Sequence, residues 1–87
     1  MSNGNWTISD AVGVIAEANE SRGVLTIQHY EGDALYLAFG DDVPEVGKGI
    51  RLSATFPLAV MTDYRASQKV SGVCDSGETC NGGYSEG

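Results

Sequence analysis

Residues 34–52 constrain the fold more than any other part of this sequence. They read ALYLAFGDDVPEVGKGIRL and begin with an alternating run. Leu35, Leu37 and Phe39 share one side of an extended chain, whereas Tyr36 and Ala38 share the other. Alternation with period two is typical of a β-strand with two unlike faces. The run is followed by an acidic loop and a short apolar segment, so the stretch predicts a strand, a long turn and a returning strand.

Similar patterns recur along the chain. Further strands are predicted over residues 12–18, 23–29, 58–62, 69–74 and 79–85. Residues 6–18 also have the spacing of a helical stripe, but Gly13 and several β-branched residues favour a strand over 12–18. Strand 23–29 is separated from 34–39 by a tight turn, so we expect the two to pair as an antiparallel hairpin. The last two strands are expected to flank a turn in the same way.

Composition agrees with a fold made of strands and turns. Twelve glycines among 87 residues suit frequent tight turns and would weaken a helical bundle. We therefore expect an all-β fold, a small antiparallel β-sandwich or barrel of six to eight short strands. Residues 1–5 are predicted to be a flexible arm and residues 6–87 a single β domain. The predicted core consists of Leu25, Ile27, Leu35, Leu37, Phe39, Ile50, Leu52, Leu58 and Val60.

Charge limits the partners. Twelve acidic against five basic residues give a net charge of −7. The basic residues are scattered, which argues against binding to nucleic acid or to an anionic membrane. An acidic mimic of DNA is an alternative, but a surface that keeps the protein soluble is the favoured interpretation. No secretion signal or transmembrane run is visible, so we expect the protein to be made and folded in a cytosol.

Several motifs follow one another in a distinctive order. They are ANESR at 18–22, LTIQ at 25–28, LYLAFG at 35–40, GKGIRL at 47–52 and a Ser-Gly turn at 76–77. This order resembles small β-sandwich proteins encoded among the virion genes of tailed bacteriophages. The resemblance implies a non-enzymatic protein on the capsid surface of the virion, which decorates or cements the major capsid protein, often as a homotrimer. The chain departs from that pattern at His29, where the family tends to have Asn, and in its two Cys.

Aromatic and basic residues are the predicted contacts with partners. Trp6, Tyr30, Tyr64 and Tyr84 are candidate interface residues, because aromatic side chains contribute strongly to binding. If several of them share one flat face, a small binding module of a tail or head fibre, which recognises a host surface or carbohydrate, is the alternative function. Arg22 and Arg51 either form salt bridges across a subunit contact or cover their own turns.

Chemical sites are not indicated. Cys74 and Cys80 would face each other in the last hairpin, either as a disulfide or as two reduced thiols. Two Cys and one His fall short of a zinc site. The acidic residues between positions 31 and 45 lack the spacing of a calcium loop. His29 has no predicted nucleophile as a partner, so we expect no catalytic residues, no metal and no cofactor.

Overall fold

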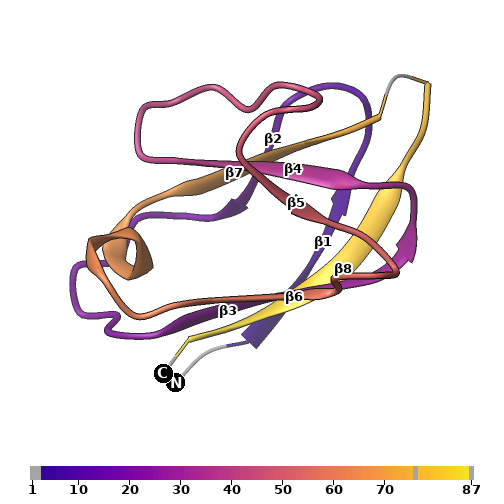
Figure 1. Cartoon of the computed structure of the whole chain (residues 1–87). Helices are drawn as coiled ribbons and strands as arrows, with labels where there is room; N and C mark the ends of the chain where they lie inside the picture. Colours follow the sequence, from indigo (N-terminus) through magenta and orange to yellow (C-terminus); the bar gives the residue numbers. More distant parts are fainter. Residues whose placement is uncertain (1–2, 76, 87) are drawn as a thin grey trace.

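The computed structural model describes residues 3–75 and 77–86, which form eight strands and one 3-10 helix. The elements are β1 (Asn3–Ile8), β2 (Gly13–Ala16), β3 (Leu25–Gly32), β4 (Leu35–Phe39), β5 (Ile50–Leu52), β6 (Leu58–Met61), η1 (Tyr64–Ser67), β7 (Val70–Cys74) and β8 (Cys80–Glu86). They make two four-stranded antiparallel sheets, β1-β8-β3-β6 and β2-β7-β4-β5, here called sheet 1 and sheet 2. The sheets pack face to face (Figure 1), which confirms the all-β sandwich. Among the described residues, no helix is able to span a bilayer.

One main core lies between the sheets. Its largest fully buried side chains are Leu25, Ile27, Leu35, Leu52, Met61, Val70, Cys74 and Cys80. Leu37 is also buried, and Phe39 and Ile50 pack against the cluster while partly exposed. Each strand directs every second side chain inward, so the apolar side chains of the two facing sheets meet and are buried between the layers. Burying one Leu or Ile side chain contributes about 1.5–3 kcal/mol.

The predicted strand, turn and returning strand are confirmed as β4, its loop and β5. Leu35 lies opposite Leu52, and Leu37 lies opposite Ile50. β4 is buried on both faces, because Tyr36 packs in a second, smaller cluster on the outer side of sheet 2. Leu35 and Leu37 face the main core, while Tyr36 packs on the other face with Ala34 and with Val73, which lies opposite it on β7.

The predicted hairpin between residues 23–29 and 34–39 is wrong. β3 pairs with β6 and β8, and β4 pairs with β5 and β7, so the turn between them crosses from one sheet to the other. The crossing lets Leu25 and Ile27 cover Leu35 from the opposite sheet, whereas a hairpin would leave both apolar faces on one sheet. Gly32 adopts φ +97°, which the sharp crossing requires.

The second predicted hairpin is wrong for the same reason. β7 belongs to sheet 2 and β8 to sheet 1, so the two strands do not pair with each other. Cys74 and Cys80 therefore do not form a pair of opposed residues within one sheet. They lie at the facing ends of two strands in different layers, and both are fully buried.

The predicted flexible arm is wrong over residues 3–5. These residues begin β1, which pairs with β8 from Asn3 opposite Ser85 to Ile8 opposite Cys80. The backbone of a polar segment gains hydrogen bonds by extending a sheet even when its side chains bury little apolar surface. Residues 1 and 2 of the predicted arm lie outside the described residues.

The predicted facing of β6 is also wrong. Leu58 and Val60 are 52% and 53% exposed, whereas Met61 is 2% exposed and Ala59 packs against the core. The register explains the difference: Leu58 lies opposite Gln28 and Val60 opposite Thr26, which face outward on β3. Because side chains alternate with period two, residues opposite each other share a face.

Candidate interaction surface

The acidic residues of this protein are gathered at the ends of the sandwich. Ten of the twelve lie in loops or turns between strands. The other two, Glu31 and Glu86, lie within the last two residues of β3 and β8. The strand centres are consequently free of negative charge, although the chain as a whole carries −7.

The outer face of sheet 1 is uncharged across its middle. The side chains that point outward from its four strands are neutral. They are Asn5 and Thr7 on β1, Asn81 and Ser85 on β8, Thr26, Gln28 and Tyr30 on β3, and Leu58 and Val60 on β6. Gly83 lies in the same face under Tyr30, since a Cβ there would lie 2.6 Å from the Tyr30 hydroxyl. This face changes from polar at β1 to apolar at β6.

The apolar end of this face coincides with a free sheet edge. β6 pairs with β3 on one side and ends the strand order of sheet 1. Phe56, two residues before the strand, is 68% exposed. Between Arg51 and Asp63 the chain has no charged residue. We call Phe56, Leu58 and Val60, with the outer edge of β6, the β6 surface.

An exposed apolar edge is unusual in a protein that stays monomeric. Edge strands are ordinarily protected by charged side chains, bulges or covering loops, because their free backbone groups pair with other strands. The β6 surface has Pro57 at its start and lies within a run that is uncharged from position 52 to position 62. Free backbone groups and exposed apolar side chains at one place are the features that a partner strand binds.

Of the four predicted aromatic contacts, Trp6 is buried and Tyr84 is only partly exposed. Trp6 is 4% exposed, and its indole Nε1 donates to the Gly83 carbonyl at 3.1 Å. It packs over Gly82, where a Cβ would lie 2.5 Å from the Trp6 ring and 1.9 Å from the Gln28 carbonyl oxygen. Tyr84 is half-buried against the core. Trp6 is therefore an internal residue, and its prediction as an exposed anchor is wrong.

Tyr30 and Tyr64 are exposed, as an interface role requires, with 59% and 73% of their surface accessible. Tyr30 lies near the end of β3, where its hydroxyl donates to the Gln28 side chain at 3.2 Å. Tyr64 begins η1, which follows β6 after a short turn. Tyr30 belongs to the neutral outer face of sheet 1, and Tyr64 lies beyond it.

Of the two alternatives for Arg22, the structure has the one within its own chain. The Arg22 guanidinium is buried and donates to the carbonyls of Ala66, Gln68 and Glu17, the last two at 2.7 and 3.1 Å. It also forms an ion pair with Glu86 at 3.3 Å. These bonds fix η1 and the end of β8 to the loop before β3. Arg51, by contrast, is exposed on β5, opposite Tyr36.

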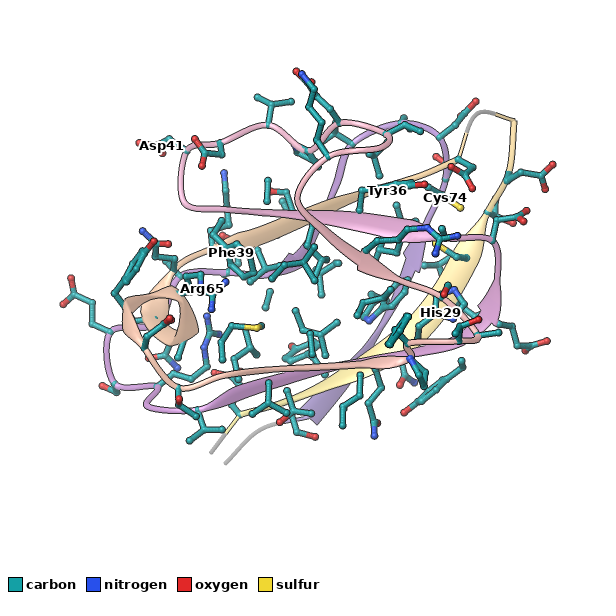
Figure 2. The ribbon with its side chains drawn as sticks, viewed as in Figure 1. His29, Tyr36, Phe39, Asp41, Arg65 and Cys74 are labelled. Atoms are coloured by element: carbon teal, nitrogen blue, oxygen red, sulfur yellow. The ribbon has the colours of Figure 1, made fainter. Side chains whose placement is uncertain are left out.

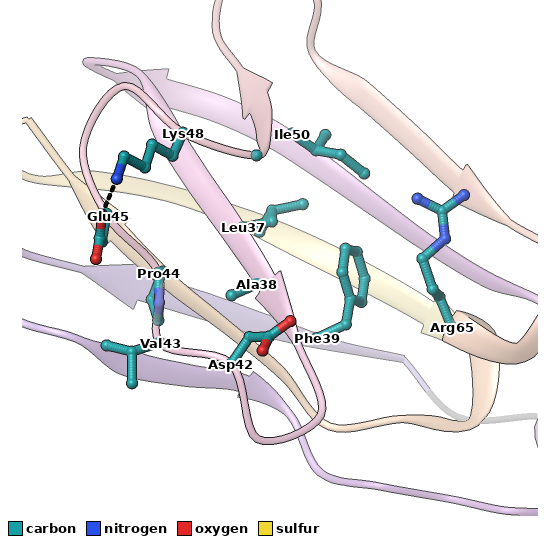
Figure 3. Close-up of a pocket in the computed structure, with 11 residues that line it drawn as sticks. Leu37, Ala38, Phe39, Asp42, Val43, Pro44, Glu45, Lys48, Ile50 and Arg65 are labelled. Atoms are coloured by element: carbon teal, nitrogen blue, oxygen red, sulfur yellow. Dashed lines mark ion pairs between the residues drawn. The ribbon is translucent and has the colours of Figure 1, made fainter.

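A second surface feature is an open groove of about 480 Å³ beside the 40–49 loop. Figure 3 shows Phe39 and Arg65 at one end of it and the Glu45–Lys48 ion pair, with a separation of 2.9 Å, at the other. The Arg65 guanidinium carbon lies 5.5 Å from the centre of the Phe39 ring. The same guanidinium forms an ion pair with Asp63 through its Nε. Hydrogen bonds from Arg65 hold the pKa of Asp63 below its usual value. The basic groups here are already paired with acidic neighbours, so the groove presents no free cation.

His29 lies inside the fold rather than in a reactive site. His29 is 5% exposed (Figure 2), and its Nε2 lies 2.7 Å from the Asp33 carbonyl oxygen. The centres of the His29 and Trp6 rings are 6.3 Å apart. A carbonyl only accepts hydrogen bonds, so Nε2 carries the proton. Across residues 3–75 and 77–86 there is no group of three or more potential metal ligands.

Sequence reasoning missed the β6 surface because it assigned Leu58 and Val60 to the core. The absence of charge between Arg51 and Asp63 was the signal that pointed to it.

Comparison with known proteins found no matching family model, and no curated protein or solved structure is significantly similar to this chain.

Proposed function

We propose that this protein is a structural, non-enzymatic component of a tailed-bacteriophage virion that decorates the capsid and stabilises the lattice of the major capsid protein. The order of its sequence motifs resembles such proteins, and a small sandwich is the fold that the resemblance implies. The observation that carries the proposal is the β6 surface, a neutral, apolar sheet edge in an acidic protein.

Charge placement supports this role. Two copies of a chain with net charge −7 repel each other, and the repulsion is strongest between their acidic ends. The β6 surface allows a close contact that brings no carboxylate into the interface. A small domain with a modest core also gains stability from such contacts by mass action.

The proposed assembly is a homotrimer bound to the major capsid protein. Contacts in a three-fold ring are heterologous, so the β6 surface of one copy would meet a different surface of the next. Pairing of β6 with β6 would instead give a two-fold dimer. Native mass spectrometry of the purified protein distinguishes these states, and a monomer or dimer at high concentration would contradict the trimer.

The fibre-module alternative depends on an exposed aromatic face. Trp6 is buried and Tyr84 is half-buried, so the four aromatic residues do not supply that face. We therefore favour decoration of the capsid.

The direct test is mass spectrometry of purified particles of the phage that encodes this chain. We expect the protein in intact particles at a fixed ratio to the major capsid protein. Its complete absence from intact particles, with the capsid protein present, would overturn the proposed function.

A further inference from the structure

The two cysteines lie together in the core although they belong to different sheets. Cys74 ends β7 opposite Leu35 in sheet 2, and Cys80 begins β8 between Ile8 and Gly32 in sheet 1. Their exposures are 0% and 2%, and both residues belong to the main core cluster. Figure 2 shows Cys74 near the end of β7. Both residues are free thiols.

The two side chains are fully buried in the same core cluster. Burial raises the pKa of the Cys80 thiol to about 12, and a hydrogen bond with the Cys74 side chain contributes next, followed by the charges of Asp33 and Asp75. Cys80 is therefore a protonated thiol at neutral pH, next to a second thiol and separated from it along the chain by residues 75–79.

We propose that Cys74 and Cys80 form an oxidation site that closes into a disulfide between the two sheets, with a low-molecular-weight disulfide such as oxidised glutathione as the oxidant. This inference stands independently of the virion role. The bond would covalently join the end of sheet 2 to the start of sheet 1, where five residues now make the connection.

The reaction is thiol–disulfide exchange in two steps. One protein thiolate attacks a sulfur of oxidised glutathione and expels a glutathione thiolate, which leaves a mixed disulfide. The other protein thiolate attacks the protein sulfur of that mixed disulfide and expels the second glutathione thiolate. Two protein thiols are thus oxidised to one disulfide, one glutathione disulfide is reduced to two thiols, and the two protein protons pass to those thiols.

Access to the pair requires local opening near the end of β7. Two hydrogen bonds hold this part of the chain to the residues after β1: the Cys74 amide donates to the Ser9 carbonyl at 2.9 Å, and the Gly77 amide donates to the Asp10 carboxylate at 2.9 Å. A glutathione disulfide does not reach a fully buried sulfur until these bonds break. The pair should therefore remain reduced during synthesis and become oxidised slowly afterwards.

The test exposes the folded protein to oxidised glutathione at about pH 8 and follows its mass and thermal midpoint. We expect the loss of two hydrogen atoms without a glutathione adduct, and a rise of about 10 °C in the midpoint. Reductant should reverse both changes. Cys74→Ser and Cys80→Ser should instead retain one glutathione. A wild-type chain that keeps both hydrogens after exposure long enough to oxidise the urea-unfolded chain, or that carries stable adducts, would overturn the proposal.

Two further measurements separate this site from nonspecific oxidation. Asp10→Ala removes the acceptor of the Gly77 amide, so its oxidation should be several-fold faster than that of the control Asp41→Ala, which removes the same charge from another loop. An equal rate in the two variants would contradict opening at the Gly77–Asp10 hydrogen bond.

The second measurement is the alkaline stability of the reduced and oxidised forms. The Cys80 pKa of about 12 exceeds its ordinary value of 9.0, so the reduced fold holds this proton more tightly than the unfolded chain does. That stabilisation is complete below pH 9 and is lost as the pH rises toward 12. The oxidised form has no thiol proton to lose, so the difference between the two thermal midpoints should widen above pH 9. A constant difference would contradict the assignment.

Discussion

β2 and β6 are both four-residue edge strands, one in each sheet, and each exposes a valine. Val14 on β2 is 48% exposed and Val60 on β6 is 53% exposed. Their surroundings differ. The pairing of β2 with β7 has a register shift after Val14, and acidic residues Asp10 and Glu17 lie just outside the strand. β6 pairs with β3 in an unbroken register and belongs to an uncharged run from position 52 to position 62, although Asp63 follows two residues after the strand.

Of these two edges, β6 is the one that we propose for assembly. A register shift and nearby carboxylates protect β2 against pairing with another strand. β6 has no register shift, and Asp63, the acidic residue that follows it, pairs with Arg65. Exposure of a valine alone does not distinguish the two edges, but the regular backbone and the uncharged run from 52 to 62 do.

The largest expected effect comes from placing a charge on the β6 edge. Val60→Asp would bring an unpaired carboxylate into the proposed contact, which should weaken attachment to particles by roughly 100-fold. Val14→Asp, a matched change on the other edge, should leave attachment within about twofold of wild type. Binding of each purified variant to capsids that lack the protein measures the difference. Similar losses from both variants would remove the distinction between the edges.

The next effect concerns the facing of β6. Met61→Ala removes a fully buried side chain and should lower the free energy of unfolding by about 2–4 kcal/mol. Leu58→Ala truncates a half-exposed residue of the same strand and should change that free energy by about 0.5 kcal/mol or less. Urea unfolding of the two variants measures both values. A larger loss from Leu58→Ala would mean that the strand faces the other way.

The sequence predicted the strands of this fold better than their arrangement in the two sheets. The period-two pattern located β3, β4 and β5 and identified the sandwich, because burial of one strand face leaves a local signature. It did not identify the layer of each strand, since a turn such as 31–33 is compatible with either a hairpin or a crossing. The facing of β6 also depended on its register with β3, which is a contact between residues distant in the sequence.

The candidate site was harder to predict than the fold. Trp6 was expected on the surface because aromatic residues are common in interfaces, but its burial depends on Gly82, which is 76 residues away. Arg22 likewise depends on the carbonyls of Ala66 and Gln68, which only the folded chain brings near it. Tyr30 and Tyr64 are exposed as expected, while the roles of these residues and of Arg51 remain predictions.

The smallest expected effect is a pH-dependent change in stability at Glu78, on an acidic turn away from the β6 surface. Hydrogen bonding to Asp33, together with its charge, raises the pKa of the Glu78 carboxyl, and burial and Asp75 add to the shift. A raised pKa in the folded state means stability that is present below the ordinary value of 4.5 and is lost as the pH rises. Glu78→Gln should therefore raise the thermal midpoint slightly at pH 7 and leave it unchanged near pH 3, with attachment to particles unaffected. Glu20→Gln, which removes the same charge elsewhere, is the control; an equal rise there would attribute the effect to net charge.

The central claim, that β6 is the edge used for assembly, is tested most directly by hydrogen–deuterium exchange of the free and particle-bound protein. The β6 amides, with residues 53–57 before them, should exchange at least about tenfold more slowly on particles, because a partner would cover this edge. Amides of β2 should exchange at the same rate in both states. Slower exchange in β2, with β6 unchanged, would contradict the account.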